Sequence, residues 1–365
     1  KNQVSNYGGA IYLSVTNNEP FNNIEILQCS FITNSALTND VDYGYGGGIY
    51  YTQKGPTAIS GNTNPSLYIH DCNFTDTTAL TNGGSICLHF ENGESLRAIE
   101  VKYCSLNINE INEEYNKPIY YGGFISYTFN PSSDYQLNNN PPLHVNNCSF
   151  SVTSDLSSQN GGSIYLSVQN SQQLGSIEIM GCNFANSKAT VNGGCIYYAY
   201  QASQTSAKTL LDTRTGDTNC ALLISECIFE SNSAEENGGS VYLEIQNTEP
   251  INPIEISHCN FNQSNAVKQN GGAIYYKFGS SSSSYHSSKL LETNQVLRII
   301  DCDFVKCSSQ INGGSVYLFI ENKQSTKQIE IRECSFEESG SETSKDSLYI
   351  NSTKPTGRFR TNSSY

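Results

Sequence analysis

The 365-residue chain contains no tryptophan and one methionine, and charged residues make up only 15% of it. Low charge, together with a hydrophobic content of 37%, separates it from highly charged disordered chains. No segment approaches the roughly eighteen consecutive apolar residues of a transmembrane helix, so we expect no membrane span. The abundant residues are polar and uncharged or small: Asn, Ser, Thr, Gln, Gly and Tyr. This composition is typical of a solvated surface made of many short strands.

Basic residues are also few. There are 20 Lys and Arg against 34 Asp and Glu, which gives a net charge of −14 and a pI near 4.8. An acidic protein repels nucleic acid and anionic lipid at ordinary salt, so we expect neither as a partner. The five histidines are scattered, and no Cys-x-x-Cys pair accompanies a histidine. We therefore expect no metal site and no cofactor.

The chain begins Lys1-Asn2-Gln3-Val4, with neither an initiator Met nor an apolar signal segment, and Gly8 already belongs to a repeat. We expect a processed or partial chain, one segment of a longer protein. Thirteen cysteines and five Asn-x-Ser/Thr sequons favour a secreted protein, located outside the cell or on its surface. The sequons are candidate N-glycosylation sites at Asn73, Asn147, Asn262, Asn351 and Asn362.

A Cys-x-Phe motif marks successive copies of a repeat. Its cysteines are Cys29, Cys72, Cys104, Cys148, Cys182, Cys227, Cys259, Cys302 and Cys334. Only Cys104 is followed by Leu in place of Phe. The spacings run 43, 32, 44, 34, 45, 32, 43 and 32, so short and long copies alternate in a unit of about 76 residues. A Gly-Gly-x-Ile/Val motif, such as GGAIYL at 8–13, lies between successive cysteines.

Each copy reads as three short strands in which alternate residues are apolar. Ile11 and Leu13 share a face after Gly-Gly, Ile24 and Ile26 share one before Cys, and Cys and Phe then point inward together. Copies stacked at roughly 4.8 Å would form aliphatic, Phe and Cys ladders inside a rod roughly 40 Å long. Gly-Gly marks a corner that needs a positive φ or a tight turn.

The sequence thus predicts an all-β fold, a single-stranded parallel β-helix (solenoid) of about nine coils that alternate short and long. The repeat domain spans 1–350, and 351–365 is a linker or tail. The extra residues of the long coils follow the Gly-Gly strand, and we expect all four insertions to leave the same side of the rod. They lie at 53–66, 130–142, 199–221 and 279–296.

These motifs resemble the right-handed β-helix of the pectin-lyase-like superfold. Within it, they are similar to the repeats of chlamydial polymorphic outer membrane proteins and of similar protist surface proteins. The GGAI signature is present at 8–11 and 271–274, and Phe-x-x-Asn at Phe31…Asn34 and Phe229…Asn232. In most other copies the Asn position holds Thr, Ser or Cys. The resemblance covers about 8–340 and implies right-handed winding and surface display, adhesion or a structural shaft.

The Cys ladder leaves two states open. Stacked Cα atoms roughly 4.8 Å apart fall inside the disulfide range of about 4.4–6.8 Å, so neighbouring coils would be cross-linked in a secreted protein. The alternative is a structural column of buried free thiols that act as small hydrophobic side chains, which parallel side chains favour. Cys220 and Cys227 form a separate candidate pair. Because thirteen is odd, at least one thiol is free or intermolecular.

An outward row of tyrosines is the best candidate contact surface. It alternates with the buried Ile/Val and comprises Tyr12, Tyr50, Tyr165, Tyr197, Tyr242, Tyr275 and Tyr317. Cys87 and Ser126 occupy the two remaining places. Exposed rings would stack on sugars or dock a partner protein, since tyrosine offers rigid amphipathic contact area. The alternative is cross-strand stacking that stabilises a sheet face.

An outward acidic row lies in the strand before each Cys. Its glutamates are Glu25, Glu100, Glu178, Glu255 and Glu330. The intervening copies hold Tyr68, His144, Leu223 and Arg298, so glutamates recur every second coil, roughly 10 Å apart. The row would hold a cation or form a periodic acidic contact strip, and the alternative is a solvated face.

Many right-handed β-helices cleave polysaccharides, and glycoside hydrolysis uses two carboxylates about 5–10 Å apart. Asp301 and Asp303 flank Cys302, with Arg298 nearby, but no Asn-Thr-Asp, Gly-His-Gly or Asp-Asp cluster of the pectinase type accompanies them. We therefore expect no catalytic residues and no enzymatic activity.

The expected function is a non-enzymatic extracellular rod, structural or adhesive, within a larger surface or filament-forming protein. Its partners would be other protein chains, copies of itself included, contacted through ends, loops or a lateral face, with glycans as a further candidate. The alternative is a pectin-lyase-like protein that binds or cleaves a polysaccharide.

Overall fold

The structure is a computed structural model, and it confirms the predicted all-β parallel β-helix. It describes residues 2–4, 7–15, 23–36, 44–53, 66–91, 98–109, 119–130, 140–154, 157–169, 176–201, 220–246, 253–279, 297–321 and 329–352. These residues form strands, turns and bends, and they contain no helix. Every strand pairing between them is parallel, as stacked coils require.

Sheet 1 is the ten-stranded sheet that follows the Gly-Gly motifs. Its strands are β2 (Ile11–Val15), β6 (Ile49–Gln53), β10 (Ile86–Phe90), β14 (Ile125–Phe129), β18 (Ile164–Gln169), β22 (Ile196–Gln201), β26 (Val241–Gln246), β30 (Ile274–Gly279), β34 (Val316–Ile320) and β38 (Leu348–Ser352). Ile49, Ile86 and Ile125 pair in register, so the repeat aligns like residues in adjacent coils.

Sheets 2 and 3 have nine strands each and contain the residues before and after the repeated cysteine. Sheet 2 consists of β3 (Ile24–Leu27), β7 (Leu67–His70), β11 (Ile99–Lys102), β15 (Leu143–Asn146), β19 (Ile177–Met180), β23 (Leu222–Ser225), β27 (Ile254–Ser257), β31 (Leu297–Ile300) and β35 (Ile329–Arg332). Sheet 3 consists of β4 (Ser30–Ile32), β8 (Asn73–Thr75), β12 (Ser105–Ile108), β16 (Ser149–Val152), β20 (Asn183–Ala185), β24 (Ile228–Glu230), β28 (Asn260–Asn262), β32 (Asp303–Val305) and β36 (Ser335–Glu337).

Short strands complete each coil between sheet 3 and the next Gly-Gly motif. They form two sheets, β1-β5-β9 and β13-β17-β21-β25-β29-β33-β37. Their bounds are β1 (Gln3–Val4), β5 (Ser35–Ala36), β9 (Thr78–Ala79), β13 (Ile119–Tyr121), β17 (Ser158–Asn160), β21 (Lys188–Asn192), β25 (Ser233–Ala234), β29 (Asn265–Ala266), β33 (Ser308–Ser309) and β37 (Gly340–Ser341).

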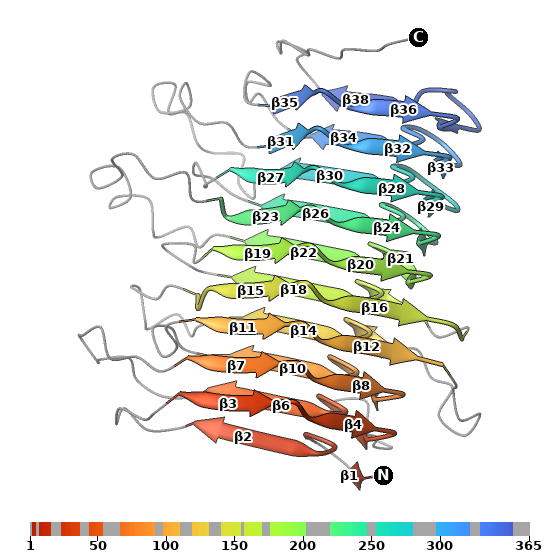
Figure 1. Cartoon of the computed structure of the whole chain (residues 1–365). Helices are drawn as coiled ribbons and strands as arrows, with labels where there is room; N and C mark the ends of the chain where they lie inside the picture. Colours follow the sequence, from red (N-terminus) through yellow and green to blue (C-terminus); the bar gives the residue numbers. More distant parts are fainter. Residues whose placement is uncertain are drawn as a thin grey trace, which may run out of the picture.

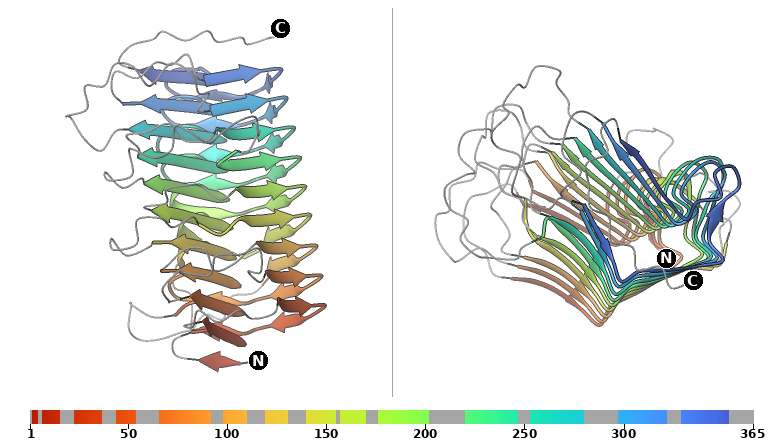
Figure 2. Two further views of the ribbon diagram at one scale, coloured as in Figure 1. Left: turned by 90° about the vertical axis from the view of Figure 1, so that its left-hand side faces the viewer. Right: turned by 90° about the horizontal axis from the view of Figure 1, so that it is seen from above.

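The coils wind in the right-handed sense. In Figure 1 the strands of sheets 2 and 3 cross the front of the rod from left to right, and those of sheet 1 return behind them, while the chain rises from its N-terminus to its C-terminus. Right-handed connection between parallel strands is the general rule, because it matches the twist of the strands. Seen along the axis, the strands of each sheet superpose and the three faces surround a narrow interior (Figure 2).

That interior is filled by columns of like side chains. Phe150, Phe184, Phe229 and their successors stack with ring centroids 4.5–5.0 Å apart and planes within 7° of parallel. Leu106 interrupts the stack, and Phe124 packs obliquely against Phe150 beside that break, at 5.8 Å. The core of described residues therefore runs through the coils as one continuous cluster.

The other two corners of the coil also have positive φ, although all but one of the residues with positive φ there are not glycine and the sequence predicts positive φ only at Gly-Gly. One corner is the residue before the repeated cysteine, with φ of 52–56° at Glu226, His258, Asp301 and Glu333 and 62° at Gly181. The other follows Phe by two places, as at Lys306 with φ 53°. Left-handed backbone costs an ordinary residue roughly 1–2 kcal/mol, so stacking holds these corners in place against a local preference.

A second interior pattern has a period of two coils. The third residue of the sheet 1 strand is alternately an aliphatic residue and a tyrosine, and Tyr51, Tyr127, Tyr198 and Tyr276 are all buried. Each of these tyrosines lies on the strand that precedes one of the four long insertions. The Tyr127 hydroxyl donates to the Pro141 carbonyl at 2.8 Å, at the end of one insertion. The inward phenol thus ties the core to the base of that insertion.

The Asn position of Phe-x-x-Asn points inward and caps the neighbouring coil. Asn232 is fully buried, accepts a hydrogen bond from the Ser187 backbone N–H at 2.8 Å and donates to the Phe184 carbonyl at 3.1 Å. Where the position holds Ser264, its hydroxyl pairs with that of Ser240 at 2.7 Å. A buried polar group needs such a partner, which explains why Asn, Thr and Ser exchange at this position.

Candidate functional surfaces

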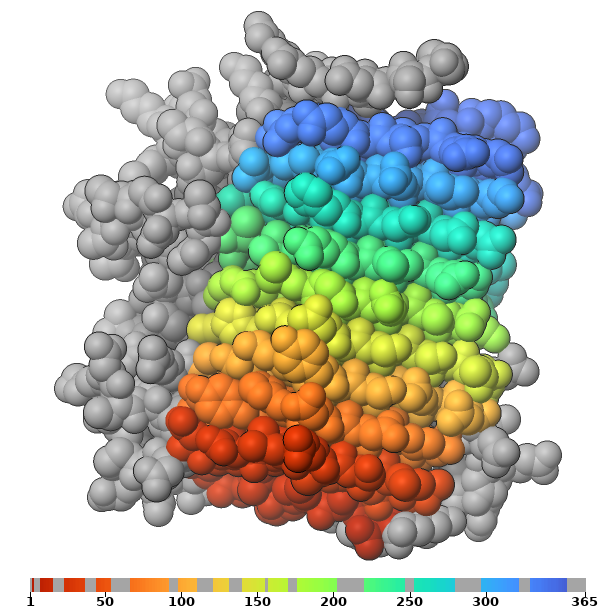
Figure 3. Space-filling view, in the orientation of Figure 1, coloured from red at the N-terminus to blue at the C-terminus, as the bar shows by residue number. Residues whose placement is uncertain are grey.

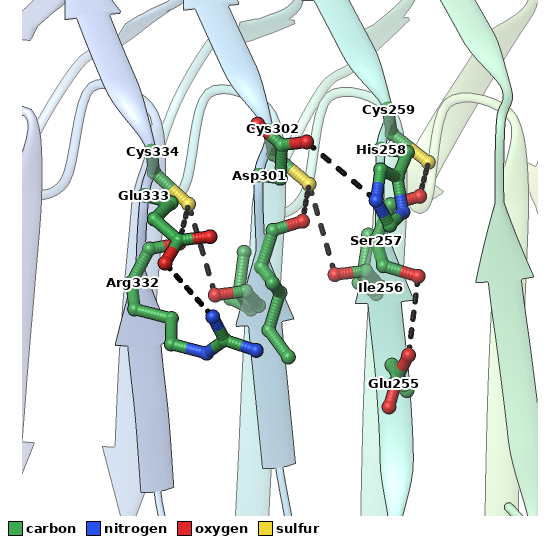
Figure 4. A network of polar contacts seen from close by, with 12 residues as sticks. Glu255, Ile256, Ser257, His258, Cys259, Asp301, Cys302, Arg332, Glu333 and Cys334 are labelled. Atoms are coloured by element: carbon green, nitrogen blue, oxygen red, sulfur yellow. Dashed lines mark hydrogen bonds and ion pairs between the residues drawn. The ribbon is translucent and has the colours of Figure 1, made fainter.

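The repeated cysteines form a column inside the corner between sheets 2 and 3. None of the thirteen cysteines forms a disulfide, so the candidate pair Cys220 and Cys227 is not bridged. From Cys72 onward each column thiol donates to carbonyls of its own coil and of the coil before it, as Cys302 does to Ile300 at 3.4 Å and Ile256 at 3.7 Å. Figure 4 shows Cys259, Cys302 and Cys334 in this arrangement.

Burial shields these thiols from reagents in solution. From Cys72 to Cys334 the column is buried, and Cys29 at its N-terminal end is half-buried. Outside the column, burial raises the pKa of the Cys220 and Cys307 thiols to about 11, so these two stay protonated at neutral pH. A buried cysteine packs as a small apolar side chain with a weak donor.

The tyrosine row occupies one register position along sheet 1, on the side away from the core. From Tyr165 onward the rings stack on one another with centroids 5.0–5.5 Å apart and planes within 16° of parallel, and Tyr349 extends the row. Cys87 and Ser126 interrupt it, and the Tyr121 ring packs on Tyr165 beside that interruption, at 4.6 Å.

Outward direction does not make these rings accessible. Tyr50, Tyr242, Tyr275 and Tyr317 are 5–9% exposed, whereas Tyr12 is 51% exposed. Tyr165 and Tyr197 are half-buried. The geometry along most of the row is therefore that of cross-strand stacking, and Tyr12 offers the most open ring face.

Glu244 anchors the centre of the row. Its carboxylate accepts hydrogen bonds from Lys277 and Gln246 at 2.9 Å and from the Tyr197 and Tyr242 hydroxyls at 3.4 Å. Burial raises the pKa of Glu244, but the bonds from Lys277 and Gln246 outweigh it and hold that pKa below its usual range. Nothing in the sequence pattern marks this glutamate, because its position varies from coil to coil and holds Ser, Thr, Ala, His, Lys, Phe or Asn elsewhere.

The glutamate row lies on the outer face of sheet 2, and an arginine and a histidine occupy two of the intervening places. Arg298 pairs with Glu255 at 2.9 Å and with Glu330 at 3.6 Å, and His144 contacts Glu178 at 2.9 Å. Opposite charges therefore alternate from Glu255 to Glu330. Such pairs at a partly exposed surface contribute little stability each, typically about 0–1 kcal/mol.

Elsewhere in the row Glu100 pairs with Lys102 at 2.6 Å within its own strand, and Glu25 is exposed near the N-terminal end.

Arg298 lies in this row instead of pairing with the two aspartates beside Cys302. Asp301 approaches His258 at 3.5 Å and Asp303 accepts from the Ser335 hydroxyl, so each aspartate contacts a neighbouring coil.

Three of the sequons lie on or beside sheet 3. Asn73 is exposed in β8, Asn147 is exposed at the positive-φ corner, and Asn262 is half-buried at the end of β28. Asn351 is exposed in β38 and donates to the Tyr317 hydroxyl at 3.1 Å, whereas Asn362 lies outside the described residues. Sheets 2 and 3 together form the broad face turned to the viewer in Figure 3.

The four insertions each connect a sheet 1 strand to the next sheet 2 strand, but 54–65, 131–139, 202–219 and 280–296 lie outside the described residues, as does 353–365.

Among the described residues no three His, Cys, Asp or Glu side chains are grouped to hold a metal ion. The same residues include no helix able to cross a membrane. No protein-family model, no curated protein and no solved structure matches the chain.

Proposed function

We propose that this chain is a non-enzymatic structural shaft within an extracellular surface or filament-forming protein. The observation that supports it is the in-register repetition of one set of contacts: the Phe stack, the Tyr row and the Glu row recur from coil to coil. Each coil is bonded to both neighbours through backbone and side chains, which makes the array stiff along its axis. A stiff rod suits the display of loops or partner sites at a distance from a surface.

We propose that the chain is related to the pectin-lyase-like β-helices, and within them to the repeats of chlamydial polymorphic outer membrane proteins and similar protist surface proteins, because this relationship fits the role of a shaft. Residence outside the cell is supported by exposed sequons at Asn73, Asn147 and Asn351. The partners we propose are other protein chains, copies of this one included, on the broad face of sheets 2 and 3 or at the ends of the stack, where β2 and β38 each pair with one strand among the described residues.

The test combines hydrodynamics with imaging of the purified chain. Analytical ultracentrifugation and negative-stain electron microscopy should find stiff particles that associate laterally or end to end as concentration rises. Incubation with a panel of polysaccharides that includes pectin should release no reducing ends. Turnover of any of these polymers would reject the non-enzymatic function.

Glycan binding is measured on the same panel with two matched variants. Tyr12→Ala removes the most open ring of the row, and Tyr242→Phe leaves a buried ring in place. Saturable binding that Tyr12→Ala abolishes and Tyr242→Phe retains, in a chain that stays monomeric, would favour glycan recognition over a shaft.

A further inference from the structure

Six Asn-Gly dipeptides occupy the same corner of successive coils in the described residues. They are Asn82-Gly83, Asn160-Gly161, Asn192-Gly193, Asn237-Gly238, Asn270-Gly271 and Asn312-Gly313. A seventh, Asn92-Gly93, lies outside the described residues. Asn-Gly pairs are prone to deamidation, and the six copies differ in the hydrogen bonds that control this reaction.

An Asn-Gly pair is where a protein chain deamidates most readily. The backbone nitrogen of the glycine loses its proton and attacks the side-chain carbonyl carbon of the asparagine, which it reaches easily because glycine has no side chain to obstruct it. The reaction has two structural requirements. The glycine N–H must be free of a hydrogen-bond acceptor, and the asparagine side chain must be free to rotate onto the glycine nitrogen.

Five of the six copies fail the first requirement. Their glycine N–H donates to a carbonyl of the next coil at 3.0–3.1 Å. The donors are Gly83, Gly161, Gly193, Gly238 and Gly271. Breaking such a buried bond costs free energy, so in the folded coil the backbone nitrogen of the glycine is not available to attack the asparagine side chain.

Several copies also fail the second requirement, because their side chains form an amide ladder. The Asn237 amide donates to Asn192 at 3.1 Å, and its carbonyl accepts from the backbone N–H of Asn270 at 3.3 Å and from the side chain of Asn270 at 3.4 Å. Asn312 donates to the Asn270 carbonyl at 3.1 Å. Asn237 and Asn270 are therefore bonded on both sides.

Asn312-Gly313 is the copy at which the pattern ends. The next coil has Ser344-Lys345-Asp346 in place of Asn-Gly-Gly, and a turn closed by the Lys345 N–H on Ser341 at 3.1 Å changes the path of the chain there. Gly314 still donates to Asp346 at 2.7 Å, but the Gly313 N–H makes no hydrogen bond within the described residues.

The Asn312 side chain is held from one side only. Its amide nitrogen donates to Asn270, whereas the coil beyond has Ser344 where the ladder would continue. Asn312 is also half-buried, so water reaches it. Both requirements of the reaction are met at this copy.

We infer that Asn312-Gly313 is the site, among the six copies in the described residues, at which the folded rod undergoes deamidation. The Gly313 nitrogen forms a bond to the side-chain carbonyl carbon of Asn312, the bond from that carbon to the amide nitrogen breaks, and ammonia leaves. Water then adds to either carbonyl of the resulting cyclic imide and gives aspartate or isoaspartate. Asparagine and water become an acid and ammonia, and no oxidant or reductant is needed.

The product changes the last ladder contact. A carboxylate at position 312 accepts hydrogen bonds and cannot donate one. The 3.1 Å bond from the side chain at 312 to the side-chain oxygen of Asn270 is therefore lost. Isoaspartate also inserts a methylene group into the backbone immediately before β34. The modification therefore loosens the attachment of the C-terminal coils to the rest of the stack.

The experiment compares six sites within one molecule. The intact chain is held at mildly alkaline pH, folded or unfolded in urea, and peptide mapping by mass spectrometry distinguishes Asn, Asp and isoaspartate at each copy. We expect Asn312 to react roughly tenfold faster than Asn237 and Asn270 in the folded chain, because those copies must first break hydrogen bonds. In urea the six rates should converge. Circular dichroism confirms that the first sample stays folded.

Two results would overturn the inference. One is a rate at Asn312 in the folded chain no greater than at Asn237, and the other is a spread among the six sites that persists unchanged in urea. Asn312→Gln provides the matched variant, since it retains an amide but lengthens the side chain. It should leave the slow rates at Asn237 and Asn270 unaltered and lower the early ammonia release by the amount that peptide mapping assigns to position 312.

Discussion

The second glycine of each Gly-Gly pair has no room for a side chain, and Gly239→Ala tests this directly. A Cβ at Gly239 would lie 2.1 Å from the Gly272 carbonyl oxygen and 2.5 Å from the Asn265 backbone nitrogen, both in the next coil. Real Cβ atoms essentially never approach within 3.0 Å, so the two coils must separate by about 0.9 Å, the difference between 3.0 and 2.1 Å. Backbone atoms cannot rotate away as a side chain can.

That separation breaks the hydrogen bonds on which the corner depends. Gly239 donates to Gly271 at 3.1 Å and Gly238 donates to Asn270 at 3.1 Å, and an added 0.9 Å takes both beyond bonding distance. Each buried donor left without a partner costs about 1–3 kcal/mol, so the two together should make Gly239→Ala lower the free energy of unfolding by roughly 2–6 kcal/mol. Urea unfolding followed by circular dichroism measures the loss, and hydrogen exchange at 233–246 localises it.

Gly181→Ala is the matched control, because it also adds one methyl group to a glycine. Gly181 has φ 62°, in a corner column whose other members are not glycine, and the added Cβ would meet only the Asn147 side-chain oxygen, at 2.6 Å. That side chain is exposed and can rotate, so the cost that remains is the left-handed backbone of a non-glycine residue, and we expect a loss of roughly 1–2 kcal/mol, smaller than at Gly239. Equal losses in the two variants, or a loss below about 1 kcal/mol for Gly239→Ala, would refute the steric argument.

Three further measurements test the interior and the tyrosine row. Because the pKa of Glu244 is lowered, its stabilising contribution is present above its unfolded-state pKa and is lost as pH falls through the folded-state value, so Glu244→Gln should flatten the acid side of a stability-against-pH curve. A thiol reagent should label at most Cys29 rapidly in the folded chain and all thirteen cysteines in urea, and rapid labelling of several would contradict the buried column. Tyr127→Phe should cost about 1 kcal/mol in urea unfolding by losing its hydroxyl bond, whereas Tyr198→Phe, whose buried hydroxyl has no partner among the described residues, should be neutral or stabilising.

The strands and columns were predictable because period-two alternation has a direct geometric meaning. Residues that alternate with Ile11 and Leu13 must face away from the core, and repeat spacing then aligns them from coil to coil. Alternation predicts the face of the sheet on which a side chain lies, but it does not predict how much of that side chain neighbouring residues cover. This is why Tyr242 belongs to the predicted row and yet is 5% exposed.

The corners were harder to predict, because positive φ there has no residue signature. Tyr103, Glu226 and His258 share the left-handed conformation although such residues rarely adopt it alone. Their only common feature is a position one before cysteine, which acquires meaning once stacking forces the turn. The end of the Asn ladder at Asn312 likewise depends on the path of the next coil, which the Asn-Gly pair itself does not encode.

The alternation of Leu and Tyr inside sheet 1 also constrains how such a rod can change its length. Duplication of a single coil would place two inward tyrosines, such as Tyr198 and a copy of itself, in adjacent coils, and would put two long insertions side by side. Duplication of a pair preserves both patterns. We therefore expect gene duplications and deletions in this chain to be tolerated in steps of two coils, so that variants of the rod differ in length by about 76 residues at a time.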